Sequence, residues 1–222
     1  MNSRRDSASK LNGASETVNS DAGAIGLSRI TGNDPDSLGV DFALLKRCKT
    51  RDVEAFGLLV DRYQARVLGY IRRMVPHREE AEDLAQEVFL RAFKNIHRFD
   101  GRASLATWFF KIANNLCIDR ARHEKRKGET LSIERDEEAF LQEITDERWN
   151  PETRAIAEEM KEIVEIAIQK LSEKLRSVLL LHDAEGLSYE EIAQVLRIPV
   201  GTVKSRLFLA REHLQDAIKQ YL

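Results

Sequence analysis

Hydroxyl and cationic side chains gather near the C-terminal end of the chain, where residues 188–211 read SYEEIAQVLRIPVGTVKSRLFLAR. Guanidinium and ammonium groups bind guanine edges and phosphates, and hydroxyl groups fix register on a nucleic-acid backbone. No acidic residue interrupts the donors between Val200 and Arg211. The pattern predicts a DNA-binding helix that uses Thr202, Lys204, Ser205, Arg206 and Arg211.

The spacing of apolar residues around these donors indicates a helix-turn-helix. Ser188 and Glu191 form a capping-box pattern that begins a short helix. Ala193 is small enough to let a second helix cross closely, and Val203 follows ten residues later. With Val203 in the core, we expect Phe208 to face solvent and to be able to contact a thymine methyl group. A plain helical hairpin with a solvated basic face is the alternative.

Other kinds of reactive chemistry are poorly represented. The five histidines are scattered, and the sequence has neither an HExxH motif nor a glycine-rich phosphate loop. Cys48 and Cys117 lie far apart in apolar helical patterns, without the paired spacing of a zinc site. We therefore expect no enzyme, no catalytic residue, no metal and no cofactor.

The elements that carry these residues are predicted to be helical throughout. The 222 residues are 42% hydrophobic and 32% charged, with only 11 Gly and 4 Pro, which favours an all-α fold. Apolar residues recur at three- and four-residue steps from Val53 to Met74, and helices are also expected over 79–95 and 104–126. Pro151 and Ser172 suit the starts of later helices, and the final one is expected to end near Lys219.

Two segments depart from this pattern. Residues 1–38 are rich in Ser, Asn, Asp and Gly, and we expect a disordered extension. Residues 127–150 are strongly acidic and are interpreted as a flexible linker. The formal net charge is only −2, so nucleic-acid contacts must come from local basic patches. No apolar stretch reaches the length of a membrane span, so we expect a cytoplasmic protein without membrane insertion.

Three segments, in order, resemble the extracytoplasmic-function group (group 4) of the sigma-70 family of RNA polymerase sigma factors. DLAQEVFLRAF (83–93) is similar to their region 2, and FDGRASLATWFFKIANNLCIDRAR (99–122) is similar to their promoter-melting segment. Residues 189–207 resemble their region 4. The resemblance spans roughly residues 42–218.

This resemblance implies two small helical domains, a sigma-two bundle and a sigma-four helix-turn-helix, joined by the acidic linker. The expected boundaries are 39–126 for region 2, 127–150 for the linker and 151–222 for region 4. It also implies a factor that binds core RNA polymerase, recognises −10 and −35 promoter elements and initiates transcription in a stress or envelope response. The implied partners are core polymerase, promoter DNA as duplex and melted strand, and an anti-sigma factor.

The resemblance also assigns residues. It implies that the −35 element is read by the helix with Thr202, Lys204, Ser205, Arg206, Phe208 and Arg211. It implies that the melted −10 element is bound by Phe99, Gly101, Ser104, Lys111, Asn115, Arg120 and Arg122. It implies that core polymerase is bound by Asp83, Gln86, Glu87, Leu90 and Arg91. Asn114 is a rival to Asn115 for the base-binding amide, and Trp108 is expected to be a core residue.

The sequence departs from the family pattern at two places. Asp100 and Arg102 carry charges that are exchanged relative to many members, and Leu209 stands where a basic residue is common. These differences affect the expected promoter preference. The alternative function is an ordinary helix-turn-helix regulator that binds duplex operators without polymerase. The pattern in residues 79–122 argues against it, because such a regulator would need a ligand pocket, a receiver domain or a dimerisation helix there.

Overall fold

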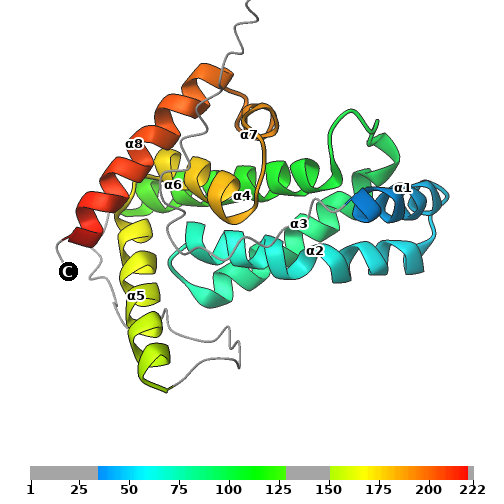
Figure 1. The fold of residues 1–222 in the computed structure, drawn as a ribbon. Helices are drawn as coiled ribbons and strands as arrows, with labels where there is room; N and C mark the ends of the chain where they lie inside the picture. The colour runs from blue at the N-terminus through cyan, green and yellow to red at the C-terminus, as the bar shows by residue number, and fades with distance from the viewer. Residues whose placement is uncertain (1–34, 129–150, 220–222) are drawn as a thin grey trace, which may run out of the picture.

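The structure, a computed structural model, describes residues 35–128 and 151–219, with side chains for 39–126 and 160–219. All regular secondary structure in these ranges is helical, so the predicted all-α class is confirmed (Figure 1). The helices are α1 (Pro35–Lys49), α2 (Val53–Met74), α3 (Arg78–Asn95), α4 (Leu105–Gly128), α5 (Pro151–Lys170), α6 (Glu173–Leu179), α7 (Tyr189–Leu196) and α8 (Val200–Lys219). None of the described helices is long and apolar enough to cross a membrane.

The predicted boundaries differ from the structure at two places. Helix α1 begins at Pro35, so the last four residues of the expected 1–38 extension are helical. Helix α4 ends at Gly128, two residues inside the expected linker. The remaining parts of both segments, 1–34 and 129–150, lie outside the described residues.

Helices α1 to α4 form an N-terminal helical domain around an aromatic core. Asp52 caps α2 by accepting a hydrogen bond of 3.0 Å from the Ala55 amide. The helix ends at Met74, because Val75 precedes Pro76 and takes the extended conformation that proline imposes on its neighbour. Phe109 and Phe110 on α4 are fully buried and pack against aromatic rings of α2 and α3.

Helices α5 to α8 form a second, C-terminal helical domain. The capping box predicted at Ser188 and Glu191 is present, and Arg197 ends α7 in the left-handed conformation. Ser172 precedes α6 as expected, but its side chain makes no capping hydrogen bond. The chain continues from α6 through a π-helical turn at Leu180–Ala184, and Gly186 adopts a φ of +70° that favours glycine.

The two domains lie directly against each other. Helix α7 packs on α4, and α5 and α6 contact α2 (Figure 1). Arg66 of α2 forms a buried ion pair of 3.0 Å with Glu185, which follows the π-helical turn. Arg73 contacts Glu165 of α5 at 2.7 Å. The sequence predicted two domains and a linker, but not this contact.

The end of α2 is stabilised by the other domain. Its terminal carbonyl groups have no partner within the helix. Gln169 donates a hydrogen bond of 3.0 Å to the Arg73 carbonyl oxygen. The Arg176 guanidinium donates to the carbonyl oxygens of Arg73 and Met74 at 3.4 Å each. Polar groups therefore provide much of the bonding across the domain boundary.

Candidate DNA and polymerase interfaces

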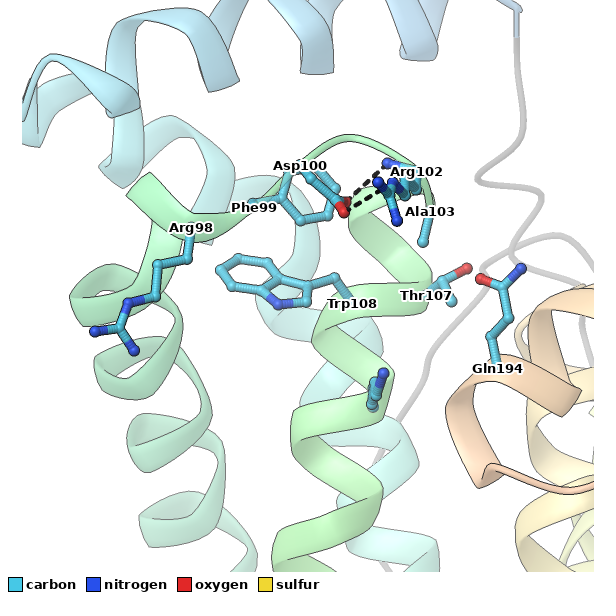
Figure 2. Close-up of a pocket in the computed structure, with 9 residues that line it drawn as sticks. Arg98, Phe99, Asp100, Arg102, Ala103, Thr107, Trp108 and Gln194 are labelled. Carbon is cyan, nitrogen blue, oxygen red and sulfur yellow. Dashed lines mark hydrogen bonds and ion pairs between the residues drawn. The ribbon is translucent and has the colours of Figure 1, made fainter.

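The loop before α4 forms a hollow with a volume of about 360 Å³ (Figure 2). Gly101 turns the loop with a φ of +78°. Asp100 holds the turn by accepting from the Arg102 amide at 3.1 Å, and its carboxylate pairs with the Arg102 side chain at 3.3 Å. We name this feature the loop hollow; its lining residues are Arg98, Phe99, Asp100, Arg102, Ala103, Thr107, Trp108, Lys111 and Gln194.

The aromatic floor of the loop hollow combines a core residue with a more accessible one. Phe99 is buried, and its ring centroid lies 5.1 Å from that of Trp108. Trp108 is only partly buried and also contacts the Phe109 ring. The indole therefore both packs on the core and presents a surface to the hollow, whereas the sequence favoured a core role alone.

The two neighbouring asparagines of α4 have different environments. Asn114 is buried, and its amide oxygen accepts a hydrogen bond of 3.0 Å from the Tyr70 hydroxyl. Burial raises the pKa of Tyr70 well above its ordinary value, so this hydroxyl stays a donor. Asn115 is exposed. Of the two amides, only that of Asn115 is presented to solvent.

Some of the cations expected to bind phosphates of the melted strand form ion pairs within the protein. Arg120 pairs with Glu80 of α3 and with Glu124 one turn later, the second at 3.3 Å. Arg122 is exposed and lies 3.8 Å from Asp119. Lys111 lines the loop hollow. Arg122 is therefore the most exposed of these three cations, and Lys111 faces the loop hollow.

Helix α8 separates a core face from a polar face as predicted. Val203, Leu207, Ala210 and Leu214 are buried, whereas Lys204 and Ser205 are exposed. Thr202 and Arg206 are partly exposed. Phe208 is 69% exposed, and Leu209 beside it is also exposed. The helix thus presents hydroxyl, cationic and aromatic groups on one side.

Two of the α8 cations also have partners on the protein. The Arg211 guanidinium forms two hydrogen bonds with the Asp183 carboxylate, one of them 3.1 Å long. Burial alone would raise the pKa of Asp183, but hydrogen bonds from His182 and Arg211 hold it below its ordinary value. The Lys204 ammonium lies 5.5 Å from the centre of the Tyr189 ring. Arg211 is therefore anchored to the π-helical turn, and Lys204 remains more exposed.

The predicted polymerase surface is one outer face of α3. Asp83, Gln86, Leu90 and Arg91 are exposed, and Glu87 pairs with Arg91 at 2.6 Å. Leu90 is 52% exposed, as expected for a residue outside the core stripe. Phe93, which the sequence did not single out, adds a second exposed apolar group on the same helix.

Several residues of the loop hollow were not found from the sequence. Thr107 and Gln194 are the clearest cases, because they come from α4 and α7, which are distant in the chain (Figure 2). Glu191 was identified only as a helix cap, but it also contacts the start of α4. The capping pattern gave no signal for this second contact. Within the described residues, no group of His, Cys, Asp or Glu is arranged to hold a metal ion.

Comparison with known proteins gives a family match for each of the two domains. The sigma-70 region 2 family matches residues 59–127, and the sigma-70 region 4 family matches residues 161–214. The RNA polymerase sigma-H factor of Pseudomonas aeruginosa is 36% identical over 184 residues, which cover 82% of this chain and 95% of that protein. The sigma-E factor of Escherichia coli K12, an extracytoplasmic-function factor, is 36% identical over 185 residues, covering 81% of this chain and 94% of that protein.

Solved structures share the fold. CnrH in complex with the cytosolic domain of CnrY matches with a TM-score of 0.58 and 22% identity, over 82% of this chain and 98% of that chain. The Bartonella quintana sigma factor RpoE, bound to the anti-sigma factor NepR, matches with a TM-score of 0.62 and 22% identity, over 74% and 96% of the two chains. With both regions present in order, the chain belongs to the extracytoplasmic-function group of the sigma-70 family and is a sigma factor that initiates transcription.

Proposed function

We propose that the sigma factor divides its work among three surfaces. The outer face of α3 binds core polymerase, α4 with the loop hollow binds the melted −10 strand, and the polar face of α8 binds the −35 duplex. The observation that carries this proposal is the exposure of Asn115 on α4, one helical turn after Lys111 of the loop hollow, while Asn114 is buried. An exposed amide can pair with the edge of an unstacked base, as readers of flipped bases do.

The direct test is transcription in vitro with purified core polymerase on a genomic promoter library. The proposal expects transcripts that depend on the sigma factor and share two sequence elements upstream of their starts. Transcripts that share a −35 element but no −10 element would contradict the role assigned to α4. The same experiment returns the promoter sequences needed below.

Leu90→Asp is expected to weaken binding to core polymerase by about 30-fold or more, which is the effect of losing an apolar interface anchor. Leu90 is exposed between charged residues, so the substitution should leave the fold intact. Binding is measured by fluorescence anisotropy of labelled sigma factor titrated with core polymerase. Ile166→Asp on α5 is the matched control, because Ile166 is an equally exposed aliphatic residue. Equal losses in the two variants would contradict the assignment.

Asn115→Ala is expected to reduce promoter opening by about 10-fold, within the range for loss of one bidentate base contact. Binding to core polymerase should change by less than about twofold, because Asn115 lies on α4 and not on the polymerase face of α3. Opening is measured by permanganate reactivity of unpaired thymines, and binding by anisotropy. Asn115→Asp keeps the size of the side chain but adds a charge, and should reduce opening at least as strongly. Equal loss of opening and polymerase binding would overturn the role of Asn115.

The proposal includes an anti-sigma factor among the partners of the sigma factor. We also propose that the sigma factor acts with core polymerase in the cytoplasm during a stress or envelope response. The support is that the Bartonella quintana sigma factor RpoE was solved in complex with the anti-sigma factor NepR, and CnrH in complex with the cytosolic domain of CnrY. Purification from native cells under non-inducing conditions should recover a stoichiometric inhibitor. Recovery of the sigma factor alone would count against this part of the proposal.

A further inference from the structure

Glu191 joins the two domains at the edge of the loop hollow. One oxygen of its carboxylate accepts hydrogen bonds from the hydroxyl groups of Ser104 and Thr107, at 3.0 Å each. Ser104 caps α4 by accepting from the Thr107 amide at 3.1 Å. The other carboxylate oxygen accepts from the Ser188 amide at 3.0 Å and completes the cap of α7. A single carboxylate therefore lies at the N-terminal ends of two helices.

This arrangement satisfies the requirements of an anion site. Hydroxyl donors and a helix N-terminus both favour a negative charge. Burial alone would raise the pKa of Glu191, but hydrogen bonds from Ser188, Ser104 and Thr107 hold it below its ordinary value. The carboxylate is therefore ionised at neutral pH. Thr107 is 1% exposed, so its hydroxyl is closed to any other ligand while Glu191 is in place.

The same helix closes one side of the loop hollow. Gln194 follows Glu191 by three residues and reaches toward Thr107 from α7 (Figure 2). Because Thr107 at the start of α4 lines the hollow, we expect a nucleic-acid strand that enters it to bring a phosphate close to this helix N-terminus. The Glu191 carboxylate opposes it in two ways, because it holds the two hydroxyl donors and because like charges repel.

We propose that Glu191 is a built-in phosphate mimic, which blocks the −10 site of the sigma factor until the two domains separate. This inference rests on the proposed binding of the −10 strand by α4. It adds that the chain itself controls access to that site. When the domains part, Ser104 and Thr107 become donors for a phosphate of the melted strand. The contact thus couples opening of the domains to competence for strand binding.

Apart from the buried Arg66–Glu185 pair, several other polar contacts at the domain boundary are suited to separation in water. Arg73 pairs with Glu165, Lys125 pairs with Glu173 at 2.7 Å, and Arg176 bonds to carbonyl groups. Contacts of this polar kind resemble those between domains that move relative to one another. The hydroxyl and carboxylate groups all regain water when the boundary opens.

The test uses the full chain without polymerase and a fluorescein-labelled single strand that carries the −10 sequence from the promoter library. Glu191→Gln and Glu191→Ala are expected to bind this strand about tenfold or more tightly than the parent, the size of one charge-assisted hydrogen bond. Glutamine is accepted at this position of a capping box, so Glu191→Gln keeps α7 capped and folded. Circular dichroism monitors the helical content of each variant.

Ser188→Ala is the matched control, because it weakens the same cap but leaves the carboxylate at Ser104 and Thr107. Its affinity for the strand should stay within about twofold of the parent. Equal affinities of the parent and both Glu191 variants, with normal transcription alongside core polymerase, would overturn the blocking role and leave the proposed function standing. An equal gain in Ser188→Ala would also overturn it, by assigning the effect to looseness of α7. Failure of every variant and the parent to initiate with core polymerase would instead contradict the proposed function.

Discussion

Arg66→Met is expected to separate the two domains in the free sigma factor. Arg66 and Glu185 are buried together, with side chains that are only 9% and 3% exposed. The guanidinium also donates to the Glu185 carbonyl oxygen at 3.0 Å. Removing one member of a buried ion pair leaves an uncompensated charge, at a cost of about 3–5 kcal/mol. Small-angle X-ray scattering should therefore show a larger radius of gyration for the variant.

The double variant Arg66→Met with Glu185→Met distinguishes loss of a partner from loss of the side chain itself. Two apolar residues of similar volume can replace a buried pair at little cost. The double variant should accordingly return toward the compact dimensions of the parent. Arg47→Met breaks the more exposed pair with Asp52 and is expected to leave the dimensions unchanged. An unchanged radius for Arg66→Met would contradict the importance of this pair.

Acid should partly restore the closed arrangement of Arg66→Met. Burial raises the pKa of Glu185 even with Arg66 present, since Arg66 only partly offsets the desolvation. A carboxyl group with a raised pKa in the closed state is accommodated best when it is protonated. The penalty in Arg66→Met is therefore full at neutral pH and declines as the pH falls toward the raised pKa. Scattering measured at decreasing pH, above the point of general acid unfolding, checks this direction.

Phe109→Ala is expected to be the most destabilising substitution in the region 2 domain. The side chain is fully buried, and its ring centroid lies 5.0 Å from Tyr63, 5.4 Å from Phe89 and 5.6 Å from Trp108. Truncation of a buried phenylalanine costs about 3–5 kcal/mol, a large share of the 5–15 kcal/mol typical of a domain. Urea unfolding followed by circular dichroism measures the loss.

Phe208→Ala provides the contrast within the same residue type. Phe208 is exposed on α8 and contributes little to the core, so its truncation should change stability by less than about 0.5 kcal/mol. Similar unfolding midpoints for the two variants would show that Phe109 does not organise the region 2 core. Both substitutions remove a phenyl ring, so a difference in stability between the two variants reports the effect of burial and not of aromatic character.

Much of the local structure could be predicted from the sequence, because helix formation depends on nearby residues. The apolar repeat from Val53 to Met74 gave the bounds of α2, and the Ser188–Glu191 pattern gave the cap of α7. The exposure of Leu90 and Phe208 followed from their places outside the core stripes. The turn after α6 was less predictable, because a π-helical turn has no simple periodic signal.

The partners of charged residues could not be predicted, because they depend on contacts between distant parts of the chain. Arg66 and Glu185 are separated by 119 residues, and no local pattern connects them. Arg120 and Arg211 were assigned to DNA from their charge and from the family resemblance, whereas the structure also gives them carboxylate partners. Their availability to a phosphate thus depends on tertiary packing.

The sequence by itself determined the helices, the two domains and the order of the sigma-70 regions, since each rests on periodicity, capping and short motifs. Only the tertiary structure decided that α7 lies against α4 and that Glu191 reaches Ser104 and Thr107. The physical reason is that the carboxylate of a capping box carries the same local signal whether or not it also bonds to side chains of a second helix. Which second donors it reaches depends on how the two domains pack, and the donors at Ser104 and Thr107 lie more than 80 residues away in the chain.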